Sequence, residues 1–176
     1  MEQILKKTQG GSLFVSRNDE WQALLELEAD IKVKYNGVIH PKTTAILNVS
    51  PDYSSSVSMY LAHALSKEGD MLDMFHVDVP YPGELVTRYQ DQFREFLDFH
   101  HLRYDNFILV EAAVLTGNNY TWMVEMMEKQ GIDRSQIITA ALYQSAESIF
   151  PCDCTGVVFG GKMVEFYYER YNKHWS

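Results

Sequence analysis

The chain has 176 residues, of which 46% are hydrophobic, 13% aromatic and 22% charged. This length and composition are typical of one globular domain, because disordered chains lack the apolar residues that offset the entropy lost on ordering. The formal net charge of −9 repels the phosphate backbone of duplex nucleic acid and argues against that polymer as a non-specific partner. A small phosphorylated ligand is compatible with this charge, since backbone N–H groups alone can hold a phosphate.

Three further features bear on where the protein resides. Residues 1–14 contain neither a long apolar core nor a small-residue cleavage site, so we expect no signal peptide. No stretch reaches the roughly 18 consecutive apolar residues of a membrane span. Cys152 and Cys154 are one residue apart, a spacing that disfavours a disulfide. These observations predict a cytoplasmic protein with reduced thiols and no membrane partner.

Short apolar runs alternate with amphipathic segments along the chain. Strands are expected at residues 13–15, 44–49, 71–79, 107–110 and 136–142. Helices are expected at residues 16–34, 57–65 and 84–101, and from a turn at 116–119 to Lys129. Residues 50–54 are expected to form a turn, and the runs 156–159 and 163–168 a final hairpin or two edge strands. This order predicts a single α/β domain over residues 1–176, with a mostly parallel sheet flanked by helices.

The segment after residue 107 carries the clearest functional pattern. Four apolar residues, 107–110, lead into Glu111 and then into a turn that opens a helix. Glycine and asparagine tolerate the positive φ of such a turn, and the N–H groups at a helix start converge on a bound anion. We therefore expect a terminal phosphate to be bound by Thr116, Gly117, Asn118, Asn119 and Tyr120. Glu111 would face the same cleft and contact ribose hydroxyls or a magnesium ion; an ordinary strand-to-helix turn without a ligand is the alternative.

This run resembles the signature of the type I phosphoribosyltransferases. That signature has four apolar residues, two acids, two apolar residues, a Thr-Gly turn and a closing hydroxyl residue, and here it corresponds to residues 107–119. Residues 13–21 are similar to the opening of the xanthine/guanine-type branch of the family, and residues 164–170 are similar to its aromatic, acid-ended tail.

The resemblance implies a set of ligands and roles. It implies phosphoribosyl pyrophosphate with Mg²⁺ as donor and a purine-type base as acceptor. Glu111 would then be the catalytic residue and a metal ligand, and Ser50 and Asp52 would lie in the pyrophosphate loop. Phe166 or Tyr168 would stack on the base, and relatives of this fold often form homodimers.

The chain also departs from the family's pattern. Ala112 replaces the second acid, Leu115 stands where purine-using relatives often carry an acid, and Asn119 replaces the closing hydroxyl residue. Asp52 would repel pyrophosphate, and helix 84–101 stands in the place of the family's mobile hood. Each lost charge-stabilising group costs roughly 3 kcal/mol in the transition state, so several losses lower the rate by powers of ten. Three functions stay open: a divergent transferase, a non-catalytic nucleotide or sugar-phosphate binding module, and an interaction protein.

Overall fold

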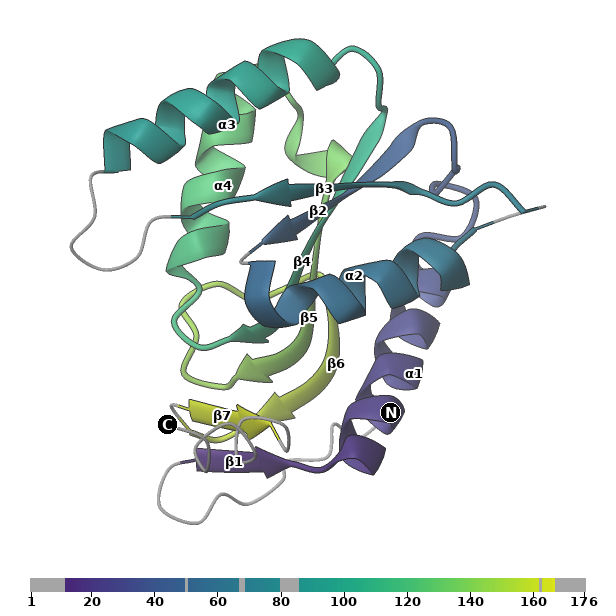
Figure 1. The fold of residues 1–176 in the computed structure, drawn as a ribbon, viewed down its shortest axis with the longest axis vertical. Coiled ribbons are helices and arrows are strands. Elements are labelled where there is room, and N and C mark those ends of the chain that lie inside the picture. Colours follow the sequence, from purple (N-terminus) through teal and green to yellow (C-terminus); the bar gives the residue numbers. More distant parts are fainter. Residues whose placement is uncertain (1–11, 50, 67–68, 80–85, 162, 167–176) are drawn as a thin grey trace.

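The computed structural model describes residues 12–49, 51–66, 69–79, 86–161 and 163–166 (Figure 1). Strands and helices alternate along most of the chain. Their bounds, in chain order, are β1 (Ser12–Val15), α1 (Arg17–Lys34), β2 (Thr44–Val49), α2 (Pro51–Ala64), β3 (Asp73–Val77), α3 (Val86–His100), β4 (Asn106–Val114), α4 (Asn118–Lys129), a 3₁₀ turn (Arg134–Gln136), β5 (Ile137–Ser145), β6 (Cys154–Phe159) and β7 (Met163–Phe166). Among the described residues, no helix is both long and apolar enough to cross a membrane.

The main sheet has five parallel strands in the order β3-β2-β4-β5-β6. From β2 the chain moves outward to β3 and then returns past β2 to β4. The strand order therefore reverses between β2 and β4, and open parallel sheets bind ligands at the carboxyl ends of the strands beside such a reversal. The mostly parallel α/β architecture predicted from the sequence is confirmed.

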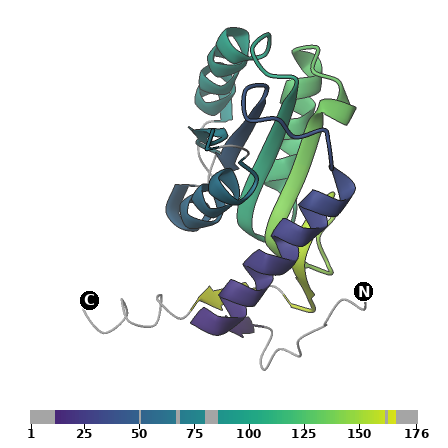
Figure 2. The same ribbon diagram turned by 90° about the vertical axis from the view of Figure 1, so that its right-hand side faces the viewer.

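Helices cover both faces of this sheet (Figure 2). On one face, Leu27 of α1 and Leu61 of α2 belong to a core cluster with Ile108 of β4. On the other face, Leu97 of α3 and Met127 of α4 belong to a second cluster, with side chains such as Leu109 of β4 and its neighbours. Because β4 is covered on both faces, its apolar residues form an unbroken run rather than an alternating one.

The first helix begins where the sequence predicted. Ser16 Oγ accepts a hydrogen bond from the Asp19 backbone N–H at 3.2 Å, and the Asp19 carboxylate accepts one from the Ser16 N–H at 3.3 Å. This reciprocal cap satisfies two backbone donors that the helix itself leaves unpaired. Ile31 is buried, whereas Trp21 is 49% and Leu25 39% exposed, so only some of the apolar side chains of α1 face the core.

The last two strands do not form a hairpin. β6 is the edge strand of the main sheet and runs parallel to β5, whereas β7 pairs in parallel with β1 in a separate two-stranded sheet. Figure 1 shows this small sheet beyond the carboxyl ends of β4, β5 and β6. The expected replacement of the hood by helix 84–101 is wrong, because α3 packs on a face of the main sheet through Phe93 and Leu97.

Candidate functional site

The reversal between β2 and β4 brings two helix starts to one edge of the sheet. α2 follows β2 and α4 follows β4, and the strands are parallel neighbours, so both helices start at the carboxyl edge. α2 begins at Pro51 and not after the expected turn, because proline at the first helical position needs no N–H partner. Ser54 Oγ accepts a hydrogen bond from the Ala112 N–H at 2.9 Å. Because β2 ends at Val49, this bond supplies a hydrogen-bond partner for the β4 backbone past the end of its neighbouring strand.

The turn between β4 and α4 has the geometry of an anion site. Gly117 is the N-cap residue of α4 and has φ 85° and ψ 2°, a left-handed conformation that glycine adopts at little cost. Among the described residues no side chain caps this helix. The Asn118 N–H donates one long hydrogen bond, to Thr116 Oγ1 at 3.4 Å, among the residues that the structure describes. The first N–H groups of a helix lack partners within it, so this turn presents donors to an anion.

Glu111 and Asn119 lie together beside this turn. Glu111 is only 9% exposed, and one of its carboxylate oxygens accepts a hydrogen bond from Asn119 Nδ2 at 3.0 Å. Burial raises the pKa of the Glu111 carboxyl to about 7, against the opposing effect of the Asn119 hydrogen bond. The carboxyl group therefore takes up and releases a proton near neutral pH, inside the cluster of residues expected to bind a ligand.

Tyr120 has a structural role that the sequence did not indicate. Its side chain is fully buried, and its hydroxyl donates to the Ala140 carbonyl at 2.6 Å. The phenol therefore anchors α4 to β5 inside the core. Only the backbone N–H of this residue is left as a group for the expected phosphate contact.

The loop between β5 and β6, residues 146–153, packs against this turn, and the sequence analysis did not predict that contact. The Ile149 N–H donates to the Thr116 carbonyl at 3.0 Å. A Cβ atom on Gly117 would lie 2.6 Å from Phe150 Cβ, so only glycine fits against this loop. Gln144 fixes the loop: its Nε2 donates to the Phe150 carbonyl at 3.1 Å. The available signal was Gln144 itself, a polar residue just after the apolar segment 140–142.

Two apolar side chains stand at the same edge. Leu115 is 36% exposed and Ile149 is 71% exposed. They flank the hydrogen bond between Thr116 and the 146–153 loop. The turn therefore combines backbone donors with neighbouring apolar surface, as a ligand with a phosphate and a flat apolar part requires.

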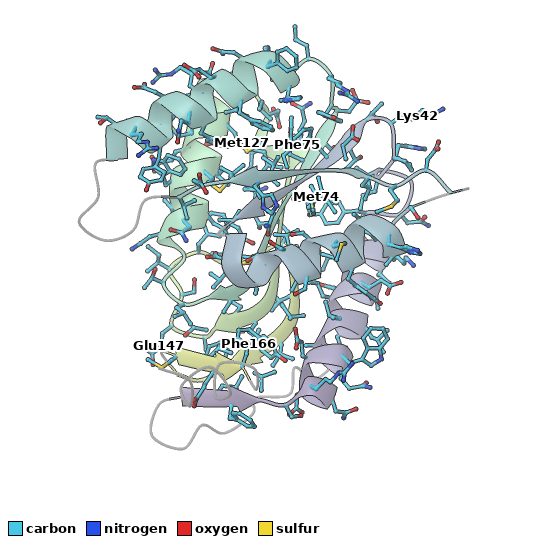
Figure 3. All side chains as sticks on the ribbon, in the orientation of Figure 1. Lys42, Met74, Phe75, Met127, Glu147 and Phe166 are labelled. Carbon is cyan, nitrogen blue, oxygen red and sulfur yellow. The ribbon has the colours of Figure 1, made fainter. Side chains whose placement is uncertain are left out.

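The other predicted site residues are placed less favourably. Phe166 of β7 is 3% exposed and packs edge-on against Tyr143, with ring centroids 5.8 Å apart (Figure 3). This packing leaves its ring little surface for a base. Tyr168, Ser50 and the side chain of Asp52 lie outside the described residues, so the base-stacking and pyrophosphate-loop predictions for them stay predictions.

A resident magnesium ion does not fit the described residues. None of them form a group of three or more histidine, cysteine, aspartate or glutamate side chains suited to a metal. Glu111 contributes a single carboxyl group, and that group is buried and hydrogen-bonded to Asn119. Magnesium at this edge would need most of its oxygen ligands from a bound phosphate compound.

Comparison with known proteins identifies the fold. No protein-family model and no curated protein sequence matches the chain. A purine phosphoribosyltransferase from Pyrococcus horikoshii is similar in structure, with a TM-score of 0.60, 16% identity and coverage of 89% of this chain and 92% of the other. A Neisseria gonorrhoeae protein with bound ppGpp gives a TM-score of 0.62 at 12% identity, covering 95% and 97%.

A third similar structure is hypoxanthine phosphoribosyltransferase from Trypanosoma cruzi in complex with IMP. It gives a TM-score of 0.55 at 14% identity and covers 88% of this chain and 82% of its own. At such low identity the likeness concerns the fold, and it extends over most of every chain compared. The parallel sheet, its strand order and these matches together show that the chain has the fold of the type I phosphoribosyltransferases.

Proposed function

We propose that this chain binds a ligand with a phosphorylated ribose, either a nucleotide or phosphoribosyl pyrophosphate, with its phosphate at the start of α4. The observation that carries the proposal is the left-handed Gly117 at a helix start without a side-chain cap, placed beside the β2/β4 reversal. Backbone N–H groups and the helix dipole attract a phosphate there, whatever the charge of the remaining surface.

The neighbouring groups suit the rest of such a ligand. The Glu111 carboxyl group and the Asn119 amide supply acceptors and donors for ribose hydroxyls, within one hydrogen-bonded pair. The exposed side chains of Leu115 and Ile149 supply apolar surface for a base. Among the proteins of similar fold, one holds ppGpp and another IMP, and both are purine nucleotides. These likenesses support a purine nucleotide as the first ligand to test.

Binding is better supported than rapid turnover. The side chain of Ala112, at the position of the second acid, is 3% exposed and packs in the core cluster with α1 and α2. Leu115 provides no proton acceptor for a base. Slow phosphoribosyl transfer is the second candidate function, favoured by the retained Glu111 carboxyl group. In that case Mg²⁺ would enter with the pyrophosphate of the donor rather than as a resident ion.

The test is calorimetric titration with GMP, ribose 5-phosphate, and phosphoribosyl pyrophosphate plus Mg²⁺. Asn118→Asp adds a negative charge in the first turn of α4, where acidic residues favour the helix but repel a phosphate. At about 5 Å and an effective dielectric constant of 20 to 80, this repulsion is roughly 1–3 kcal/mol per phosphate charge. We therefore expect affinity to fall at least about tenfold.

Asn36→Asp is the matched control, because it adds the same charge on an exposed residue in the loop after α1, at the amino edge of the sheet. Its affinity should equal that of the parent protein. Binding that weakens equally in both variants would contradict the proposed phosphate position. Absence of heat with all three ligands, in a protein that unfolds cooperatively, would contradict the binding function itself. Release of pyrophosphate with a purine base would favour the transferase.

A further inference from the structure

One side chain connects the end of β5 to the loop that follows it. Gln144, the last residue but one of β5, makes three hydrogen bonds. Its Nε2 donates to the Phe150 carbonyl at 3.1 Å, and its Oε1 accepts from the Cys152 N–H at 3.2 Å. The same oxygen accepts from Thr155 Oγ1 of β6 at 3.0 Å. Two of the three bonds therefore act on the backbone of the 146–153 loop.

The part of the loop that Gln144 holds is the part that contacts the turn before α4. A Cβ atom on Gly117 would lie 2.9 Å from the Phe150 backbone nitrogen as well as 2.6 Å from its Cβ. The neighbouring Ile149 N–H donates to the Thr116 carbonyl at 3.0 Å. Two consecutive loop residues thus contact two consecutive residues of the turn. A shift of the Phe150 backbone would change the surroundings of the left-handed Gly117.

We propose that Gln144 is a positioning residue of the ligand site, and that it makes the site favour a whole nucleotide over a sugar phosphate. This inference rests on the phosphate position proposed above. The Ile149 side chain is 71% exposed at the base end of that site, while its backbone N–H is bonded to the turn. A nucleotide contacts the loop and the turn together, whereas a sugar phosphate contacts the turn alone. A loop that is already ordered spares the nucleotide the entropy cost of ordering it.

The two ends of the loop are fixed without Gln144. At its start the Ala146 N–H donates to the Phe159 carbonyl at 2.8 Å. At its end the Asp153 carboxylate accepts hydrogen bonds from the Arg134 guanidinium at 3.0 and 3.1 Å. Variants of Gln144 should therefore fold with β5 and β6 paired as in the parent. Their effect should fall on the middle of the loop, which is the part that contacts the turn.

The first test is hydrogen exchange of the Ile149 amide in the ligand-free protein. Gln144→Glu keeps an acceptor for the Cys152 N–H but loses the donor to the Phe150 carbonyl. A hydrogen bond of this kind changes an equilibrium roughly fivefold, so protection of the amide should fall by at least about that factor. Thr155→Val is the control, because it removes the bond to Gln144 that does not reach the loop. Unchanged protection in Gln144→Glu, or equal loss in the control, would overturn the proposal.

The second test compares GMP with ribose 5-phosphate by calorimetric titration. Gln144→Leu removes both bonds to the loop, so affinity for GMP should fall at least about tenfold and that for ribose 5-phosphate only about threefold. Thr155→Val should bind both ligands like the parent. A Gln144→Leu variant that keeps its affinity for GMP, or that loses affinity for both ligands equally, would overturn the proposed selectivity. A parent protein that binds neither ligand would contradict the proposed function, and hydrogen exchange would still show whether Gln144 positions the loop.

Discussion

Replacing Glu111 by glutamine is expected to stabilise the protein at neutral and alkaline pH and to change little at acidic pH. The Glu111 carboxyl group is 9% exposed, and burial raises its pKa to about 7. Glutamine has nearly the same shape as the protonated acid and keeps an oxygen for the hydrogen bond from Asn119 Nδ2, which is 3.0 Å long in the parent. It removes only the charge that the buried position disfavours.

The size of the effect follows from the two pKa values of this group. The unfolded chain ionises Glu111 near pH 4.5, whereas the folded chain holds the proton until about pH 7. The contribution of this proton to folding is complete below pH 4.5 and is lost as the pH rises through 7. At about 1.4 kcal/mol per pKa unit, the parent loses on the order of 3 kcal/mol of unfolding free energy over this range. Glutamine does not titrate, so its variant should keep that free energy.

Urea unfolding between about pH 5 and pH 8 measures this difference, since the two curves should diverge as the parent ionises. Glu128→Gln is the control, because Glu128 is exposed on the same helix, α4. Its stability should follow that of the parent at every pH. A Glu111→Gln variant whose unfolding free energy stays parallel to the parent's would refute the argument that burial controls this carboxyl group.

Two further substitutions test the packing around the turn. Gly117→Ala should cost more than about 2 kcal/mol in urea unfolding, from the positive φ and from a Cβ 2.6 Å from Phe150 Cβ. Gly131→Ala has the same φ of 85° with nothing within 4 Å, so it should cost only about 1–2 kcal/mol; equal losses would contradict the close contact. Ala112→Asp buries a carboxylate at a position 3% exposed and should lower stability by several kcal/mol. Ala113→Asp, at a half-buried position, should lower stability less, and the reverse order would contradict the burial assigned to β4.

The elements predicted best are those determined by neighbouring residues. The strand predicted at 44–49 is observed with those bounds, and all of its side chains are buried, as expected for a mostly apolar strand inside a parallel sheet. The first helix starts at the cap formed by Ser16 and Asp19, which needs only residues three apart in sequence. The turn at Gly117 and the contact between Glu111 and Asn119 could also be predicted, because both lie within a single strand, the turn after it and the helix that follows.

The features that the sequence did not reveal depend on distant partners. β7 pairs with β1 across almost the whole chain, and nothing within residues 163–166 specifies that partner. The 146–153 loop reaches the turn through a hydrogen bond from Ile149 to Thr116, which depends on β4 and β5 being neighbours. Trp21 is exposed because the sheet buries only part of the apolar face of α1. The apolar stripe of a helix shows which side faces the core, but it does not show how much of that side is buried.

The departures from the family's signature differ in physical meaning because β4 has two faces. Ala112 faces the α1–α2 side, where it is packed, and its N–H is bonded to Ser54 of α2. A carboxylate at this position would have to lose its hydration, so the close packing of α2 against β4 disfavours an acid there. Glu111 faces the other side and keeps a carboxyl group next to the turn. Phosphate binding at this edge thus depends on the backbone geometry of the Gly117 turn, which this chain retains. Stabilisation of a cationic sugar depends on carboxylates, and the packing around Ala112 disfavours one of them. This division favours a protein that holds a nucleotide over one that transfers its ribose phosphate.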